Sequence, residues 1–488
     1  MQMLSDYLYN EIISELDFKP LEGQKKVIKK LSEFAGAEKN RNEIFLLKGY
    51  AGTGKTSIIA AIVKALSKNK IKTILTAPTG RAAKVLSKYA KKEAFTIHKK
   101  IYRQQSSSGA FGKFVLDVNL HKNTIFIVDE ASMIANQSYE NVNFGSGKLL
   151  DDLIEYVYSG QNCKLILTGD TAQLPPVKLE ISPALDIKTL EIYGYDVIEF
   201  ELTEVVRQEK ESGILYNATK LREILKKSMQ YNERTVFKGF PRIKTDVFKD
   251  IEKINGADLI DAISDAYHKY SEQDTVIICR SNKRANRFNQ GIRAKVHFKE
   301  DEIGGGDLVM VVKNNYFWAE DYEETDFIAN GDTAEVVSVS NYTERYGYRF
   351  ADAVLKFFDY GNVEIKAKIL IDTLTSDTAS LSYEQNNELY KKIEEDYSDI
   401  KNKQKRFKKI RENPYFNALQ IKFAYAVTCH KAQGGQWKKV FIDQGWITEE
   451  MINKEFLRWL YTAFTRAEKQ LSLINFRKEF FHEDDISE

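Results

Sequence analysis

The chain of 488 residues contains few of the residues that mark secreted or cross-linked proteins. Its three cysteines, Cys163, Cys279 and Cys429, form no CxxC pair, so neither a disulfide framework nor a zinc site is indicated. We expect all three to be buried as small apolar side chains. Only seven prolines and no low-complexity tract are present, which argues against long disordered linkers.

Long apolar runs are also missing. None reaches the roughly 18 residues that a membrane span requires. Residues 1–20 carry acidic groups where a signal peptide has a basic start and an apolar core. We therefore expect a soluble, cytoplasmic protein without a membrane partner. The 72 basic and 70 acidic residues give a net charge of +2, which excludes a uniformly basic coat but leaves room for a local basic groove.

Short apolar runs that end in polar or glycine-rich turns, each followed by a helical pattern, indicate an α/β protein. Strands that alternate with helices in this way predict a parallel sheet covered on both faces. A first series ends near residue 204 and a second follows it. The first series is Ile44–Leu47, Thr73–Thr76, Ile125–Val128 and Leu165–Thr168, and the second is Thr275–Cys279, Phe423–Thr428, Val440–Asp443 and Leu471–Ile474.

A different pattern interrupts the second series. Residues 304–372 alternate apolar and polar side chains, and Asn330-Gly331 and residues 360–362 supply hairpin-type turns, which predicts a small antiparallel barrel. Residues 383–413 are charged and favour helices. We expect a solvated helical pair there, whose basic end is either a plain solvated face or a surface that follows phosphates.

The stretch "GYAGTGKT", residues 49–56, fits GxxxxGK[ST] between an apolar strand and a helical pattern. Glycines let backbone N–H groups turn inward around phosphates, Lys55 reaches the terminal phosphates of ATP, and the Thr56 hydroxyl can ligate Mg²⁺. The residues that we expect to surround the nucleotide are Gly49, Ala51, Gly52, Thr53, Gly54, Lys55, Thr56 and Ser57.

Two further segments predict hydrolysis rather than phosphate binding alone. In "TIFIVDEAS", Asp129 can hold Mg²⁺ and Glu130 can polarise a water for attack on the γ-phosphate; a helix cap is the alternative for these carboxylates. In "LILTGDTAQLPPV", the amide of Gln173 can sense the γ-phosphate or the attacking water, or can belong to an ordinary surface loop.

With these motifs in view, the chain resembles superfamily 1B helicases of the RecD and phage Dda type. Eight blocks occur in the order of that family and run from residue 49 to 471: "GYAGTGKT", "TAPTGRAAKVL", "TIHKKIY", "VDEASM", "LTGDTAQLPPV", "VVRQ", "AVTCHKAQGGQW" and "LYTAFTRAEKQL". The resemblance implies an α/β fold of two RecA-like parallel-sheet P-loop lobes with a small β-hairpin insertion and an SH3-like β-barrel insertion. The implied boundaries are 1–102 and 124–204 for lobe 1A, 103–123 for the hairpin, 205–303 and 414–488 for lobe 2A, and 304–413 for the barrel with its helical extension.

The resemblance also assigns residues to the nucleotide. Gln24 would recognise adenine, and Gln433 and Gly434 would lie at the nucleotide. Arg207 and Arg466 look like the two arginines that approach the γ-phosphate, where a fixed guanidinium stabilises developing charge. The block "KAQGGQW" has Gln436 where many relatives have glutamate, so a contact to the ribose stays open.

DNA contacts follow from the same resemblance. They fall on Pro78, Thr79, Thr96 and His98 in the first lobe and on Thr428, His430 and Lys431 in the second. Hydroxyl, imidazole and lysine groups suit phosphates and sugars and do not read sequence. For the two histidines, an ordinary partly buried histidine is the alternative.

Residues 103–123 are expected to form a β-hairpin that acts as a strand-separating pin, with Phe111 or Phe114 as the wedge. A base-pair step is worth about 1.4 kcal/mol in stacking, which a rigid apolar wedge has to overcome. Alternatively, the two aromatic rings pack the hairpin onto its lobe.

The sequence thus predicts an ATP-dependent DNA helicase, a functional monomer that moves 5′ to 3′ on single-stranded DNA and opens forks, with replication or repair proteins as further partners. The polarity comes from the resemblance alone. A P-loop kinase for a small substrate is one alternative, although it leaves the second α/β lobe unexplained. An ATP-gated single-stranded-DNA-binding subunit of a recombination complex, without unwinding of its own, is the other.

Overall fold

The computed structural model describes residues 2–37, 42–104, 114–137, 145–204, 211–230, 239–319, 322 and 327–481. The chain divides into two compact units. The described residues of unit 1 fall within Met1–Gln105, Lys113–Val236 and Lys454–Thr462, and those of unit 2 fall within Phe237–Asn453 and Ala463–Glu488.

Across these described ranges, no helix combines the length and the apolar character needed to span a bilayer. The three cysteines are buried, as predicted.

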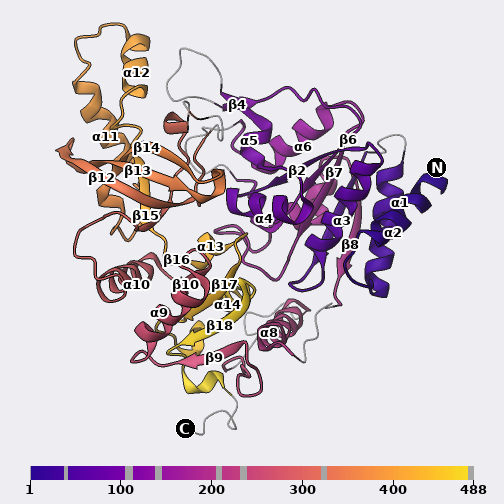
Figure 1. The fold of residues 1–488 in the computed structure, drawn as a ribbon. Helices are drawn as coiled ribbons and strands as arrows, with labels where there is room; N and C mark the ends of the chain where they lie inside the picture. The colour runs from indigo at the N-terminus through magenta and orange to yellow at the C-terminus, as the bar shows by residue number, and fades with distance from the viewer. Residues whose placement is uncertain are drawn as a thin grey trace. The chain divides into compact units, whose positions relative to one another are not determined.

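A parallel sheet forms the centre of unit 1 (Figure 1). Its order is β3-β2-β6-β7-β1-β8, and every neighbouring pair is parallel. The four predicted strands are confirmed as β1, β2, β6 and β7. The strands are β1 (Glu43–Gly49), β2 (Lys72–Ala77), β3 (Ala94–Thr96), β6 (Thr124–Val128), β7 (Lys164–Gly169) and β8 (Asp196–Leu202).

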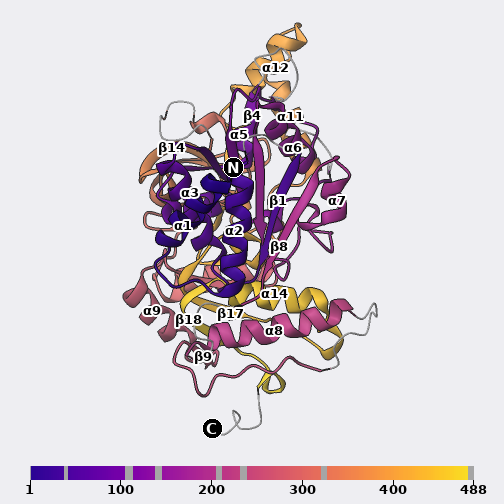
Figure 2. The ribbon, with the colours of Figure 1, turned by 90° about the vertical axis from the view of Figure 1, so that its right-hand side faces the viewer.

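Both faces of this sheet are covered, because successive side chains of a strand point to opposite faces. Phe45 and Leu47 of β1 join the core cluster that includes α1 to α4, whereas Ile44 and Leu46 join the cluster that includes α5 and α6. Figure 2 shows α1, α2 and α3 on one side of β1 and β8, and α7 on the other. The helices of unit 1 are α1 (Gln2–Ser14), α2 (Glu22–Gly36), α3 (Lys55–Lys68), α4 (Gly80–Ala90), α5 (Ile97–Ile101), α6 (Leu149–Ser159), α7 (Ile187–Glu191) and α8 (Gly213–Gln230).

The expected hairpin has two short strands, β4 (Tyr102–Gln104) and β5 (Phe114–Leu116), which pair antiparallel with Tyr102 opposite Leu116. Residues 105–113, which connect them, lie outside the described residues.

Unit 2 contains a second parallel sheet in the order β16-β10-β17-β18-β9. Its strands are β9 (Ile251–Ile254), β10 (Thr275–Cys279), β16 (Ala426–Thr428), β17 (Trp437–Asp443) and β18 (Ala467–Ile474). The helices beside it are α9 (Leu259–Tyr270), α10 (Asn282–Lys295), α13 (Cys429–Ala432) and the end of α14 (Lys454–Phe464).

The predicted barrel is a closed five-stranded one in unit 2. The tight β12–β13 turn is formed by Tyr346 and Gly347, both with positive φ (57° and 78°), as a two-residue hairpin requires. The predicted strand run Phe423–Thr428 differs from the structure, because Phe423 ends a barrel strand and only Ala426–Thr428 joins the sheet. The barrel strands are β11 (Leu308–Val311), β12 (Thr333–Arg345), β13 (Tyr348–Phe357), β14 (Val363–Leu370) and β15 (Leu419–Phe423).

With these two sheets, the hairpin and the barrel, the predicted fold class is confirmed. The predicted helical pair is also present as α11 (Tyr383–Glu395) and α12 (Lys403–Arg411). Leu389, Ile393 and Ile410 are the buried side chains of this pair, and they pack against Phe350 and Leu370 of the barrel.

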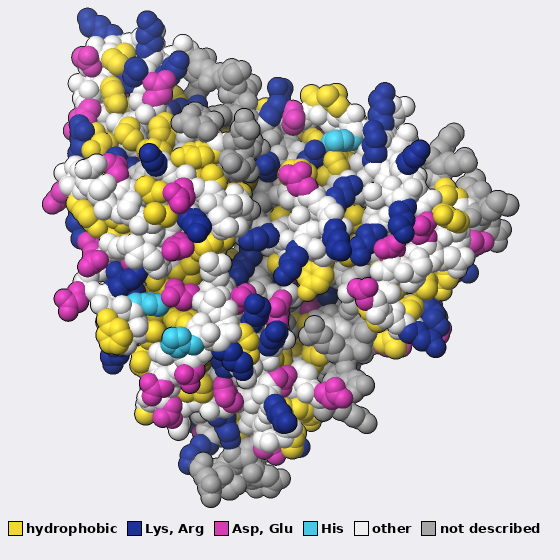
Figure 3. All heavy atoms as spheres, in the orientation of Figure 1, with side chains coloured by type: hydrophobic (Ala, Val, Ile, Leu, Met, Phe, Trp, Pro, Cys, Tyr) yellow, Lys and Arg dark blue, Asp and Glu magenta, His cyan; other side chains and the backbone are white. Residues whose placement is uncertain are grey.

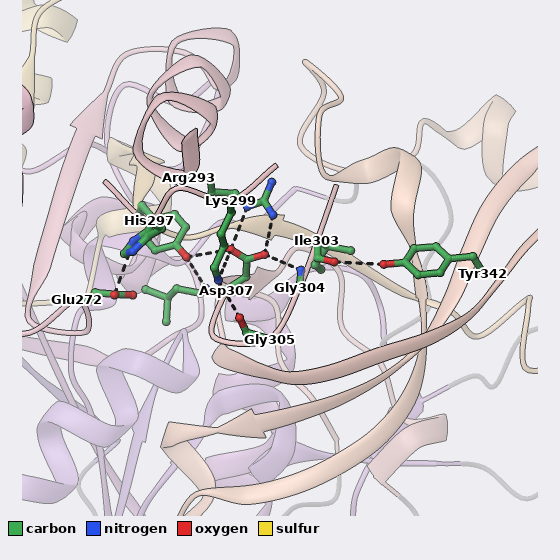
Figure 4. A network of polar contacts seen from close by, with 11 residues as sticks. Glu272, Arg293, His297, Lys299, Ile303, Gly304, Gly305, Asp307 and Tyr342 are labelled. Carbon is green, nitrogen blue, oxygen red and sulfur yellow. Dashed lines mark hydrogen bonds and ion pairs between the residues drawn. The ribbon is translucent and has the colours of Figure 1, made fainter. Parts of the chain in front are cut away.

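A buried ionic network fastens the start of the barrel to α10 (Figure 4). The carboxylate of Asp307, fully buried, accepts two hydrogen bonds from Arg293 at 2.9 and 3.0 Å and one from Lys299 at 3.0 Å. The Gly304 N–H at 2.8 Å and the Tyr425 hydroxyl at 3.2 Å complete the set. Burial by itself raises the pKa of Asp307, but these donors outweigh it and hold the pKa below its ordinary value.

Candidate functional site

The phosphate loop lies between β1 and α3 of unit 1. Gly52 and Gly54 have φ values of 77° and 85°, in the left-handed region where glycine is favoured. A Cβ at Gly49 would come within 2.9 Å of Thr53 Oγ1 and 3.0 Å of Lys55 Cδ. The glycines predicted from the motif are therefore required by the turn itself.

Hydrogen bonds hold the loop in this shape. Lys55 Nζ donates to the Gly49 and Tyr50 carbonyls, and Thr53 Oγ1 donates to the Tyr50 carbonyl at 2.8 Å. Gln24, fully buried, donates from Nε2 to the Thr53 carbonyl at 2.8 Å, and its Oε1 accepts from Leu21 N–H at 2.9 Å. The Gln24 amide thus supports the loop, whereas its contact with adenine stays a prediction.

Asp129 and Glu130 directly follow β6, and the phosphate loop directly follows β1. Because β6, β7 and β1 are neighbouring parallel strands, both segments lie at the carboxyl ends of the strands of the sheet. Glu130 has a positive φ of 52°, and its N–H donates to Asp129 Oδ1 at 2.9 Å. Burial and then the charge of Glu130 raise the pKa of Asp129 to about 7, while the Lys55 ammonium acts in the opposite direction. The structure therefore brings Asp129, Glu130 and Lys55 together.

Gln173 follows β7 at these strand ends and is 6% exposed. Its Oε1 has no hydrogen-bond partner within the described part of the chain. Leaving a buried amide oxygen unpaired costs free energy unless a ligand or water supplies a donor. A donor from a ligand or a water would satisfy the Gln173 amide oxygen.

Two residues of this site were not predicted from the sequence. Asp170, at the end of β7, is 1% exposed and accepts a hydrogen bond from the Tyr461 hydroxyl at 2.7 Å. The same hydroxyl accepts from the Ala51 N–H of the phosphate loop at 2.9 Å. Asp170 belongs to the block "LTGDTAQLPPV" and Tyr461 to the block "LYTAFTRAEKQL". Nothing in the sequence indicates that the two residues are in contact.

Neighbouring residues of α14 make similar contacts within unit 1. Thr462 Oγ1 accepts from Leu174 N–H at 2.9 Å, and Arg458 donates to the Glu180 carbonyl. This part of α14 is therefore fixed to the segment that carries Gln173.

The predicted DNA-contact residues of unit 1 lie directly after β2 and at the end of β3. Thr79 caps α4 by accepting from Ala82 N–H at 3.2 Å, and Thr96 caps α5 by accepting from Lys99 N–H at 3.1 Å. Pro78 directly precedes the first cap. A capping oxygen keeps its own hydrogen, so both hydroxyls can still donate to a ligand.

His98 lies in α5, two residues after Thr96. Its ring centroid is 5.8 Å from that of Tyr102, whose hydroxyl donates to Asp152 Oδ2 at 2.6 Å. Burial lowers the pKa of His98 to about 4 against the smaller, opposing charge of Asp152, although the side chain keeps some exposure. His98 is thus neutral near pH 7, which agrees with the alternative of a partly buried histidine.

In unit 2, Thr428 ends β16, His430 is exposed, and Lys431 is partly buried. Lys431 Nζ donates to Asn330 Oδ1 of the barrel. Beyond α13, Gln433 is buried, and Gly434 has a positive φ of 72°.

Of the two predicted arginines, one lies among the described residues. Arg466 is buried in unit 2, where its guanidinium donates to the Gly435 carbonyl at 3.2 Å and to Thr465 Oγ1 at 3.1 Å. Arg207 lies outside the described residues. Their approach to the γ-phosphate stays a prediction.

Of the two candidate wedge residues, Phe111 lies outside the described residues, and Phe114 is partly buried. Phe114 packs with Leu116 against the core cluster of α5 and α6. This contact agrees with the packing alternative for Phe114.

Charge on the molecular surface is mixed. In the face that Figure 3 displays, Lys and Arg side chains are interspersed with Asp and Glu side chains. This agrees with the expectation from the net charge that no uniform basic coat is present on that face.

Comparison with known proteins gives matches at both ends of the chain. Residues 22–234 match the family described as AAA domain, and residues 423–474 match the UvrD-like helicase C-terminal domain. The RecBCD enzyme subunit RecD of Buchnera aphidicola (subsp. Schizaphis graminum) is 24% identical over 481 residues, which cover 90% of this chain and 71% of that protein. The ATP-dependent DNA helicase dda of Enterobacteria phage T4 is 27% identical over 283 residues, which cover 56% of this chain and 57% of that protein.

A crystal structure of Pif1 helicase from Bacteroides in complex with ADP-AlF3 and single-stranded DNA superposes with a TM-score of 0.46 at 16% identity, covering 96% of this chain and 95% of that one. The sequence matches place the phosphate loop in one family domain and the block around His430 in the other. Together with the RecD and Dda relatives, they confirm the resemblance of this chain to superfamily 1B helicases of the RecD and Dda type.

Proposed function

We propose that this protein is an ATP-dependent DNA helicase that moves along single-stranded DNA in the 5′ to 3′ direction and opens duplex at forks. One observation carries the proposal: Lys55, Asp129, Glu130 and Gln173 are gathered where the strands of one parallel sheet end, and the buried amide oxygen of Gln173 has no partner among the described residues. A site of this kind positions a terminal phosphate and an attacking water together. Resemblance to the helicase family links that chemistry to DNA.

The residues present fit a nucleotide and a divalent cation. Backbone N–H groups of the glycine-rich loop and the Lys55 ammonium would hold the phosphates. Thr56 Oγ1 and the Asp129 carboxylate would hold Mg²⁺, which supplies positive charge to the phosphate oxygens when it is bound. Glu130 would accept a proton from the attacking water, and Gln173 would orient that water.

Arg207 and Arg466 complete the proposal as the guanidinium groups that stabilise the transition state, and we extend it to closure of the two RecA-like lobes during turnover. Movement along the DNA strand would follow if residues such as Thr96 and Thr428 bind and release it in alternation. The direction of movement and the closure rest on the resemblance.

A forked duplex with a single 5′ tail, compared with one carrying a single 3′ tail, tests the proposal. Unwinding of the 5′-tailed fork alone, with ATPase activity stimulated by single-stranded DNA, is the expected result. Unwinding of only the 3′-tailed fork would reverse the polarity.

The RecD relative is named as a subunit of a larger enzyme, which favours a second candidate: an ATP-gated DNA-binding subunit of a recombination or repair complex. Binding of single-stranded DNA with ATP turnover but no unwinding of either fork would support this candidate.

A further inference from the structure

Two lysines of unit 2 line one pocket from different elements. Lys422, on barrel strand β15, is 8% exposed, and Lys431 belongs to α13. Thr428, Asn282 and Asn286 line the same pocket. The pocket therefore lies where the barrel and the second sheet of unit 2 meet.

The hydrogen-bond partners of both ammonium groups are neutral oxygens. Lys422 Nζ donates to the Thr373 carbonyl at 3.1 Å and to the Ser376 carbonyl at 2.5 Å, and Lys431 Nζ donates to Asn330 Oδ1. Over the ranges that the structure describes, neither lysine forms an ion pair with a carboxylate. The charge of Asp377 raises the pKa of Lys422, but this effect is weaker than that of burial, which lowers it.

Two other buried cations of unit 2 have a carboxylate partner. Arg293 pairs with Asp307 at 2.9 Å, and Lys439, 4% exposed, pairs with Glu252 at 2.6 Å. Burying a charge is costly unless a counter-charge is present. Two neighbouring ammonium groups without one therefore indicate that an anion normally enters the pocket.

The charge of Lys422 also acts on Lys431. Burial, followed by the charge of Lys422, lowers the pKa of Lys431 to about 8, and burial lowers the pKa of Lys422 to about 8. A bound anion would restore the charged form of both groups.

We propose that this pocket binds one phosphate group of a single-stranded nucleic acid, held between Lys422 and Lys431 with the Thr428 hydroxyl as a further donor. The inference rests on the proposed function, since a bound strand supplies the phosphate. It adds Lys422, a barrel residue outside all of the sequence motifs, to the contacts expected from the family resemblance. One phosphate would thereby join the barrel to α13.

The salt dependence of binding tests the inference. For single strands, the logarithm of the binding constant falls with the logarithm of salt concentration by about 0.7 for each neutralised phosphate. Fluorescence anisotropy with labelled oligo-dT should give a slope for Lys422→Gln that is shallower than wild type by about that amount. Lys439→Gln is the matched control, because it removes an equally buried lysine that already has a carboxylate partner, and it should keep the wild-type slope.

If Lys422→Gln fails to fold, the pH dependence of oligo-dT binding by the wild-type protein tests the inference instead. Because Lys422 and Lys431 must be protonated to hold the phosphate, oligo-dT affinity at constant salt should fall several-fold between pH 7 and pH 9. Ordinary lysines, with pKa values near 10.4, stay charged over this range. An affinity that is constant between these pH values contradicts the inference.

The possible results distinguish failure of this inference from failure of the proposed function. Equal slopes for wild type and a folded Lys422→Gln variant overturn the inference and leave the helicase proposal standing, whereas absence of any binding by wild type overturns both. Inorganic phosphate, added at constant ionic strength, distinguishes the source of the anion. If it raises the thermal midpoint of wild type but not of Lys422→Gln, while the oligo-dT slopes coincide, the pocket serves a free anion and the inference fails.

Discussion

The hydroxyl of Tyr461 donates a hydrogen bond to Asp170 at 2.7 Å, and both residues are 1% exposed. Because the same hydroxyl accepts from an N–H of the phosphate loop, it holds two parts of the nucleotide site at once. Burial, with the charge of Asp170 as the next cause, raises the pKa of Tyr461 far above its ordinary value, so the hydroxyl stays a donor at every physiological pH.

Replacing Tyr461 by phenylalanine removes this hydroxyl and leaves the ring. We expect the unfolding free energy of the domain to fall by about 1–3 kcal/mol, because a buried carboxylate and a buried N–H each lose a partner. Urea denaturation followed by circular dichroism measures the change. Tyr7→Phe is the control, since Tyr7 is 55% exposed, and equal midpoints for the two variants would contradict the assigned role.

Lys55→Ala should abolish DNA-stimulated ATP hydrolysis and leave the fold intact. The Lys55 ammonium contacts loop carbonyls rather than a core, so its loss removes phosphate-directed charge and little packing. A coupled phosphate-release assay measures the rate. Lys68→Ala, at the exposed end of the same helix, should retain wild-type turnover. Turnover by Lys55→Ala within a factor of about ten of wild type would show that the site is misassigned.

The sequence predicts those parts of the site that are encoded by local patterns, but not contacts between residues far apart in the chain. The phosphate loop and the Asp129-Glu130 pair are local patterns at the ends of continuous apolar strands, and these are in the predicted places. The contact between Tyr461 and Asp170 joins residues 291 positions apart, and no periodicity or spacing encodes such a contact.

The prediction of strands is limited in the same way, because it depends on local apolar runs. The strand Asp196–Leu202 alternates charged and apolar residues at the sheet edge, so it lacks the apolar run that identifies the central strands. The run Phe423–Thr428 is predicted as one strand, although Phe423 belongs to the barrel and Ala426–Thr428 joins the sheet. Hydrophobicity marks both parts as buried but does not say in which sheet.

Gln173→Leu separates catalysis from stability. Because the buried Gln173 Oε1 has no partner among the described residues, an apolar side chain of similar size should leave the thermal midpoint unchanged or raise it slightly. If the amide orients the attacking water, kcat should fall by roughly 10²-fold or more, with a smaller change in KM. Steady-state ATPase kinetics and a thermal melt give both quantities. A lower midpoint with unchanged kcat would assign Gln173 to the fold alone.

Asp307 makes unit 2 sensitive to acid. Its pKa in the folded protein lies below the unfolded value, so its contribution to stability is fully present above about pH 4 and is lost as pH falls through the folded pKa. We expect Asp307→Asn to lower stability at pH 7 by about 3–5 kcal/mol, since Arg293 is left buried without its counter-charge. The difference from wild type should shrink towards pH 2. Denaturant titrations at these two pH values provide the measurement, and a pH-independent difference would contradict the ionic role.

Phe114 decides between a wedge and a packing role for the hairpin. The ring is partly buried against the core cluster of unit 1, so Phe114→Ala should lower the unfolding free energy by about 1–3 kcal/mol. Phe114→Leu keeps apolar volume and should recover most of that loss, with unwinding per ATP hydrolysed close to wild type. A stacking wedge predicts the opposite result, because leucine cannot replace an aromatic face at a base pair and unwinding would fall while ATPase survives. Unwinding and ATPase rates measured on one forked duplex, with Phe111→Ala run in parallel, therefore show which of the two aromatic residues separates the strands.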